Sequence, residues 1–133
     1  MNICTITGRL VADANLREAT DSESGEIRKF LAMRVAVNYR KGGKEITSYF
    51  DVTRNVGAEN IYPYAYKGRM VTVSGPVSFS QSIVQGKLYA NLRISANSLE
   101  FLDKHDQAKV AARGGKPAAT ETPETDEEIP LEE

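Results

Sequence analysis

Three separate stretches of this sequence combine aromatic residues with lysine and arginine. Aromatic rings stack on nucleobases, at roughly 1–3 kcal/mol per stacked base, while lysine and arginine follow the phosphates of a single strand. The candidate binding residues are Arg34, Tyr39, Arg40, Lys41, Lys44, Tyr49, Arg54, Phe79, Lys87, Tyr89 and Arg93. Residues of these types predict a surface that binds single-stranded nucleic acid without reading its sequence.

Aromatic residues in strands have an alternative role, because they also pack in the core or against a cross-strand neighbour. Tyr49 and Phe50 are adjacent, so they point to opposite faces of a regular strand, and we expect one of them in the core. The set Tyr62, Tyr64 and Tyr66 is spaced by two, and we interpret it as packing around a short helical segment.

The inventory of reactive side chains argues against an enzyme. The sequence has one histidine, His105, and one cysteine, Cys4, whereas a zinc site needs several such ligands and a disulfide needs two cysteines. Cys4 lies in an apolar strand pattern and is expected to pack as a small hydrophobic residue. No phosphate-binding glycine loop or dinucleotide-binding motif is present. We therefore predict no catalytic residues, no metal and no cofactor.

Charge is distributed unevenly along the chain. Residues 121–133 hold seven acids and no lysine or arginine. The chain has 18 acids and 17 bases in total, so the first 120 residues hold 11 acids beside all 17 bases and carry a net charge of +6. A basic body suggests a polyanionic ligand. An acidic tail suggests a segment that this ligand displaces or that another protein binds.

The elements that must position the binding residues are strands. Apolar and polar residues alternate in five segments, which are residues 3–11, 27–39, 46–54, 69–75 and 88–102. Turns at residues 41–44 and 85–87 separate neighbouring segments, Pro76 marks a break or an edge, and residues 56–67 contain a short helix. These elements predict an all-β domain, either a closed or nearly closed barrel or a sandwich.

The regular pattern ends at Asp103. Residues 104–133 are mostly Lys, Ala, Gly, Pro, Thr and Glu, and they bury too little apolar surface to offset the entropy of ordering. We expect a binding domain at residues 1–103, a disordered linker at 104–120 and a disordered acidic tail at 121–133. No stretch approaches the roughly 18 apolar residues of a membrane span, so we expect no membrane partner and a cytoplasmic protein.

Several segments occur together in an order typical of one protein family. They are residues 6–10, 34–38, 58–60, 67–69, 73–75 and 98–102, followed by Asp126, Glu127, Glu128, Ile129, Pro130 and Leu131 in the tail. In this combination the chain resembles bacterial and phage single-stranded DNA-binding proteins over nearly its full length. The resemblance implies an OB-fold, a five-stranded Greek-key barrel with a short helix between strands 3 and 4. It also implies non-specific binding and protection of single-stranded DNA in replication, recombination and repair, without catalysis.

The resemblance further implies partners and stacking residues. Members of the family recruit replication, recombination and repair proteins through the tail, and they assemble as homotetramers, with a homodimer as the alternative. Tyr39, Tyr49 and Phe79 are similar to the first, second and last stacking positions of the family. The remaining stacking position falls near Asn55, which cannot stack as an aromatic ring does.

The tail departs from the family pattern at its end. Family tails end in Ile-Pro-Phe with a terminal carboxylate, whereas Leu131 stands here in place of phenylalanine, and Glu132 and Glu133 follow it. This ending and the absence of tryptophan suggest a phage or mobile-element member. Such a protein would be nucleoid-associated in its own cell or, if phage-encoded, located in the host cytoplasm.

Two other hypotheses stay open. An OB-fold adaptor would act mainly through protein–protein contacts in a replication complex, a role that the tail also suits. An OB-fold nuclease would hold a metal ion with acids such as Asp21, Glu23 and Glu26, for which a solvated loop is the simpler interpretation. Under the DNA-binding hypothesis, the acidic tail occupies the basic surface until DNA displaces it and frees residues 129–131 for partners.

Overall fold

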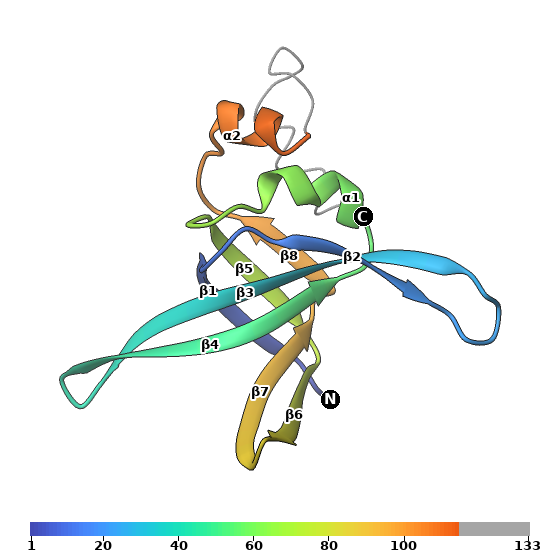
Figure 1. Ribbon diagram of the computed structural model, residues 1–133. Helices are drawn as coiled ribbons and strands as arrows, with labels where there is room; N and C mark the ends of the chain where they lie inside the picture. The colour runs from blue at the N-terminus through green and yellow to red at the C-terminus, as the bar shows by residue number, and fades with distance from the viewer. Residues whose placement is uncertain (115–133) are drawn as a thin grey trace.

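Strands form most of the protein, in agreement with the alternating sequence pattern. The computed structural model describes residues 1–114, so the predicted acidic tail lies outside the described residues. The strands join in one sheet with the order β6-β7-β4-β3-β1-β5-β8, and β2 pairs with β3 (Figure 1). They are β1 (Cys4–Leu10), β2 (Asn15–Thr20), β3 (Ile27–Lys41), β4 (Lys44–Arg54), β5 (Met70–Gly75), β6 (Val77–Val84), β7 (Lys87–Ser95) and β8 (Ser98–Phe101).

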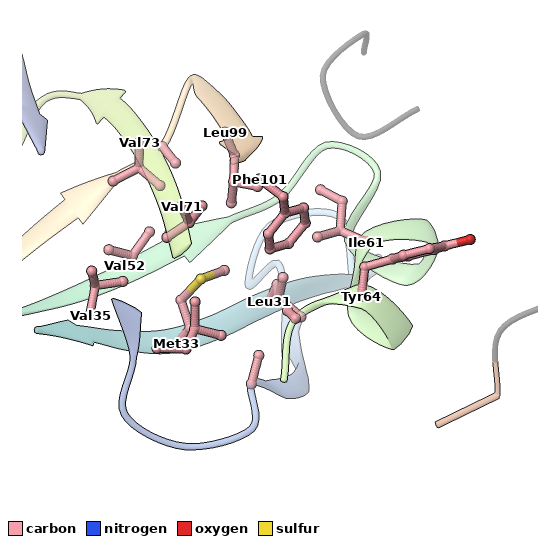
Figure 2. Close-up of a cluster of buried hydrophobic side chains, with 14 of the residues drawn as sticks. Leu31, Met33, Val35, Val52, Ile61, Tyr64, Val71, Val73, Leu99 and Phe101 are labelled. Atoms are coloured by element: carbon pink, nitrogen blue, oxygen red, sulfur yellow. The ribbon is translucent and has the colours of Figure 1, made fainter. Parts of the chain in front are cut away.

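The core lies between the inward-facing side chains of the sheet and the short helices α1 (Ala58–Ile61) and η1 (Tyr62–Tyr64). These helices confirm the short helical segment expected between the third and fourth predicted strands. Figure 2 shows the central cluster, in which Leu31, Met33, Val35, Val52, Ile61, Tyr64, Val71, Val73, Leu99 and Phe101 meet. Each fully buried aliphatic side chain of this kind contributes roughly 1.5–3 kcal/mol to stability.

Two glycines inside strands allow close approach of neighbouring backbones. A Cβ atom on Gly8 of β1 would overlap the carbonyl oxygen of Ala36 in β3. A Cβ atom on Gly75, at the end of β5, would overlap the carbonyl oxygen of Ser95 in β7. Glycine is required at both positions because any side chain would push two strands apart, and this accounts for glycine in otherwise apolar strand patterns.

Two of the predicted strands are divided in the structure. Pro76 separates β5, which pairs with β1 and β8, from β6, which pairs with β7. Residues 88–102, expected as one strand, are divided between β7 and β8 at residues 96 and 97. The Ala96 N–H donates to the Thr53 carbonyl at the end of β4, and the Asn97 N–H donates to the Ser74 carbonyl of β5. The chain therefore turns from one part of the sheet to another at this point.

The strand β2 was not predicted from the sequence. It pairs with the first half of β3, from Asn15 opposite Ala32 to Thr20 opposite Ile27. Only Leu16 of this strand is partly buried, so the hydrophobic alternation that reveals a half-buried strand is lacking. The pairing extends β3 into a long hairpin that projects from the sheet, as the β3–β4 and β6–β7 hairpins also do (Figure 1).

Residues 107–112 correct the expectation of a disordered linker over residues 104–120. They form the helix α2 (Gln107–Ala112), in which Val110 is buried. The Asp106 side chain caps the helix by accepting hydrogen bonds from the backbone N–H groups of Ala108 and Lys109. Among residues 1–114, no helix has the length and apolar character needed to cross a membrane.

The three tyrosines spaced by two hold this last segment against the domain. The Arg113 guanidinium lies over the Tyr62 ring at 4.3 Å, and the Tyr66 hydroxyl accepts a hydrogen bond from the Asp106 N–H at 2.6 Å. The rings of Tyr64 and His105 meet edge to face at 5.1 Å. The tyrosines therefore pack around the helices, as predicted, and they also position α2.

Candidate nucleic-acid interface

Several predicted binding residues share the face of β3, β4 and β7 that points away from the core, which we call the outer face. Side chains alternate along a strand, so Arg34 points outward beside the fully buried Val35. Ladder pairing places Arg34 opposite Asp51 of β4, and Asp51 opposite Arg93 of β7. Tyr49 lies two residues before Asp51 on β4 and therefore on the same face. Residues distant in sequence thus form adjacent rows.

Tyr49 carries the best-defined aromatic contact on the outer face. Its side chain is exposed, whereas the adjacent Phe50 packs against the core, so the expected division between the two rings is confirmed. The Arg34 guanidinium lies over the Tyr49 ring, 5.1 Å from the ring centroid. Such a cation–π contact at an exposed site contributes roughly 0.5–1 kcal/mol. It restrains an exposed ring and holds a positive charge beside it.

A second aromatic and basic pair lies on β7. Tyr89 is exposed, and the Lys87 ammonium lies 6.0 Å from its ring centroid. Both side chains alternate with the apolar residues of β7, and Arg93 follows on the same face. Lys87, Tyr89 and Arg93 therefore extend the outer face along the β6–β7 hairpin.

Tyr39 of β3 and Phe79 of β6 lie on the opposite face of the sheet. Tyr39 alternates in phase with the buried Val35, although it lies on the projecting β3–β4 hairpin and is 45% exposed. Phe79 is opposite Leu92, which is opposite Phe50 on the core side, and it is 61% exposed. The predicted stacking residues are thus distributed over two faces. A single strand that touches both sets must pass around an edge of the sheet.

The tip of the β3–β4 hairpin is strongly basic. Arg40, Lys41 and Lys44 are exposed there, and the Arg40 guanidinium donates to the Gly43 carbonyl at 3.0 Å. Lys41 and Lys44 face each other across the two strands. Like charges in this position are destabilising, so the pair has no evident structural benefit. Its effect is to concentrate positive charge at the end of an extended arm.

Arg54 does not belong to this surface. Only 3% of the residue is exposed. Its guanidinium donates to the carbonyl oxygens of Val56, Ala96 and Asn97 at 3.0, 3.1 and 2.6 Å. The predicted phosphate contact is therefore wrong for Arg54, which instead ties the end of β4 to the turn between β7 and β8. Asn55, which falls near the third stacking position, is exposed and offers no ring.

Sequence reasoning missed a groove on the outer face between the β2–β3 hairpin and β7. Its volume is about 420 Å³, and residues of β2, β3, β4 and β7 line it. Arg17 of β2 and Phe30 of β3, which pair across the two strands, belong to its lining. Hydrophobic periodicity could not have found these residues, because β2 itself shows almost none.

Other reactive groups are dispersed among residues 1–114, and no group of histidine, cysteine and acidic residues there could hold a metal ion. Cys4 is partly buried against the core, as expected. The Lys29 ammonium donates to the Glu59 carboxylate at 2.7 Å, and this hydrogen bond raises the pKa of Lys29. That contact joins β3 to α1 and lies away from the outer-face residues.

Comparison with solved structures places the fold. The chain superimposes on the SSB of Plasmodium falciparum, solved in complex with ssDNA, with a TM-score of 0.59 and 22% sequence identity over 77% of this chain and 96% of the other. The present chain therefore has the SSB fold. The small single-stranded DNA-binding protein of Streptomyces coelicolor gives a TM-score of 0.55 and 18% identity over 80% of this chain and 95% of the other.

The SSB fold confirms the resemblance seen in the sequence at the level of architecture, which is a mostly β structure with a short helix. No family model and no curated protein matches the sequence. The identities to both solved structures lie below the range at which a shared fold carries a shared activity. The site must therefore be argued from its own residues.

Proposed function

We propose that this protein binds single-stranded DNA largely without sequence specificity and has no catalytic activity. The observation that carries this proposal is the outer face. There, Tyr49 under Arg34 and Tyr89 beside Lys87 combine exposed rings with positive charge on neighbouring strands. A ring can stack on the face of any base, while the cations neutralise phosphates, so this arrangement suits a strand of any sequence.

The two-faced distribution of the aromatic residues supports a wrapped path for the strand. Tyr49 and Tyr89 offer rings on the outer face, and Tyr39 and Phe79 offer rings on the other. The basic tip of the β3–β4 hairpin, at Lys41 and Lys44, lies at the end of the ribbon that separates these faces. A strand that rounds the hairpin would meet all four rings.

We also propose that the sheet closes as the five-stranded OB barrel. The hydrogen bonds of Ala96 to β4 and of Asn97 to β5 support it, because one short segment joins two strands that β3 and β1 separate in the strand order. The long strands would then be β5 with β6 and β7 with β8, each bent in the middle. Slow hydrogen exchange at the Ala96 and Asn97 amides would support closure, and exchange at the rate of a free turn would exclude it.

Assembly as a homotetramer, or alternatively a homodimer, is part of the proposal. The β6–β7 hairpin exposes Ile83, Leu88 and Leu92 by 73%, 58% and 38%, and these residues share one face of the hairpin. Contiguous exposed apolar side chains on a small domain are typical of an interaction surface. Light scattering on the full chain measures the assembly directly. A monomer at tens of micromolar protein would reject it.

The acidic tail is the segment that we propose contacts other proteins. Residues 121–133 lie outside the described residues, and their seven acids supply the supporting observation. We propose that the tail competes with DNA for the basic surface and recruits replication, recombination and repair proteins in the cytoplasm. Deletion of residues 121–133 should then tighten DNA binding at low salt and abolish recruitment. The Leu131-Glu132-Glu133 ending is the basis for proposing a phage or mobile-element origin.

Titration of fluorescent oligo-dT with the full chain tests the function. We expect binding at micromolar protein or below in low salt, with affinity that falls as salt rises. No binding under these conditions would reject the proposal in favour of the adaptor, for which the exposed apolar hairpin face is the supporting observation. A labelled strand incubated with Mg²⁺ should remain intact, and cleavage would indicate a nuclease.

A further inference from the structure

The groove on the outer face is built around two small side chains. Ala32 of β3 and Thr53 of β4 pair with each other and form the middle row of its lining. Larger side chains flank this row, with Arg17 and Phe30 on one side and the row of Arg34, Asp51 and Arg93 on the other. The hollow of about 420 Å³ falls within the range of roughly 300–1,000 Å³ that small-molecule sites occupy.

The groove contains a carboxylate that has no partner among the described residues. Asp51 is partly buried, and within residues 1–114 its carboxylate forms neither a hydrogen bond nor an ion pair. The other acid of the lining, Asp13, is already engaged, because its carboxylate accepts from the Lys67 N–H at 2.8 Å and pairs with Arg113 at 3.4 Å. An ionised carboxylate only accepts hydrogen bonds, so the partly exposed Asp51 is free to take a donor from a ligand in place of solvent.

The arginines around Asp51 define which ligand can bring that donor. Arg17 and Arg93 are exposed at the two sides of the groove and form no ion pair within residues 1–114, and Arg34 lies over Tyr49. Such a set suits an anionic chain that also carries neutral donors. A nucleotide strand has both, since its phosphates are anionic and adenine, cytosine and guanine bear exocyclic amino groups.

We propose that the groove holds one nucleotide of the bound strand and that the Asp51 carboxylate accepts a hydrogen bond from the exocyclic amino group of its base. Arg17 and Arg93 then contact the flanking phosphates, and the small Ala32 and Thr53 leave room for the base. Thymine has no amino group, and its one ring donor, N3–H, lies between two carbonyl oxygens that would repel the carboxylate. A binder that is otherwise indifferent to sequence therefore disfavours thymine at this one subsite. The inference rests on the proposed single-stranded DNA binding.

The test compares the affinities for oligo-dC and oligo-dT, of equal length and at neutral pH, between the wild-type full chain and Asp51→Asn. The asparagine amide keeps the shape of the side chain but can also donate a hydrogen bond to a thymine carbonyl oxygen. The variant should therefore no longer disfavour thymine. We expect the ratio of dC affinity to dT affinity to fall by about fivefold or more in Asp51→Asn. Glu45→Gln is the matched control, because it removes a carboxylate from the same face of β4 nearer the hairpin tip. It should leave the ratio unchanged.

A second variant tests the groove independently of charge. Ala32→Ile fills the hollow with a β-branched side chain, a type that is common in strands. It should lower the ratio of dC affinity to dT affinity as Asp51→Asn does, although Asp51 is unchanged. Unchanged ratios in both Asp51→Asn and Ala32→Ile, with strong binding to both oligonucleotides, would overturn this inference and leave the proposed function standing. Equal shifts in Asp51→Asn and Glu45→Gln would overturn it too, since general charge would explain them. Failure of the wild-type chain to bind either oligonucleotide would reject both proposals.

Discussion

The Arg34 guanidinium lies over the ring of Tyr49, its central carbon 5.1 Å from the ring centroid, on the face of the sheet that points away from the core. Arg34 is on β3 and Tyr49 on β4, two pairs apart in the ladder. The contact therefore depends on the register of the hairpin. It holds an exposed ring and a positive charge side by side, as the proposed binding of a single strand requires.

Tyr49→Ala should weaken binding of oligo-dT by about 1–3 kcal/mol, because one stacked base loses its ring. Tyr49→Phe keeps the ring and serves as the control, with an expected affinity close to that of the wild type. Fluorescence anisotropy at fixed salt measures both. Equal affinities in all three proteins would show that Tyr49 does not stack on DNA.

Replacing both Lys41 and Lys44 by glutamine should reduce the dependence of binding on salt. Each phosphate neutralised on a single strand contributes about −0.7 to the slope of log affinity against log salt, so loss of two contacts should flatten the slope by about 1.4. The double variant should be as stable as the wild type or slightly more stable, since two like charges no longer face each other. Lys104→Gln, just beyond β8, is the control and should leave the slope unchanged.

Arg54→Met should lower the free energy of unfolding by about 3–5 kcal/mol, as removal of a buried charged partner commonly does. Three carbonyl oxygens lose their donor, and two of them belong to the turn between β7 and β8. Urea denaturation followed by circular dichroism measures the loss. The exposed Arg93→Gln should change stability by less than about 0.5 kcal/mol. Similar small losses in both variants would contradict the structural role of Arg54.

Gly75→Ala should destabilise the domain by about 1–3 kcal/mol or prevent folding, because its Cβ would displace the Ser95 carbonyl. The comparison is Ser78→Ala on the exposed β6, which should be nearly neutral. Thermal denaturation distinguishes them. A melting temperature for Gly75→Ala equal to that of the wild type would show that β5 and β7 are further apart than the structure has them.

Truncation defines where the folded domain ends. A chain that stops after residue 114 should keep the stability of the full protein, whereas one that stops after residue 103 should lose about 2–4 kcal/mol. The shorter chain lacks the buried Val110 and the contacts of Arg113 with Tyr62. Urea denaturation of both chains shows whether the folded domain ends at residue 103 or at residue 114. Equal stabilities would restore the boundary expected from the sequence.

Much of the fold follows from local patterns. The alternation around Val35, Val52 and Val71 predicted strands and their buried faces correctly, because a period of two in polarity is encoded in adjacent residues. The strand β2 was missed because it buries little, so its pairing with β3 leaves no periodic trace in the residues themselves.

The sequence by itself determined the strand pattern, the divided charge and the kinds of residue available to bind a single strand. Tertiary structure alone decided how those residues are used. It buried Arg54 against carbonyls of residues 96 and 97, it held α2 on three tyrosines, and it opened a groove beside Asp51. These outcomes depend on contacts between residues far apart in the chain, and a lone arginine or aspartate in a strand looks the same in sequence whether it faces solvent, carbonyls or a ligand.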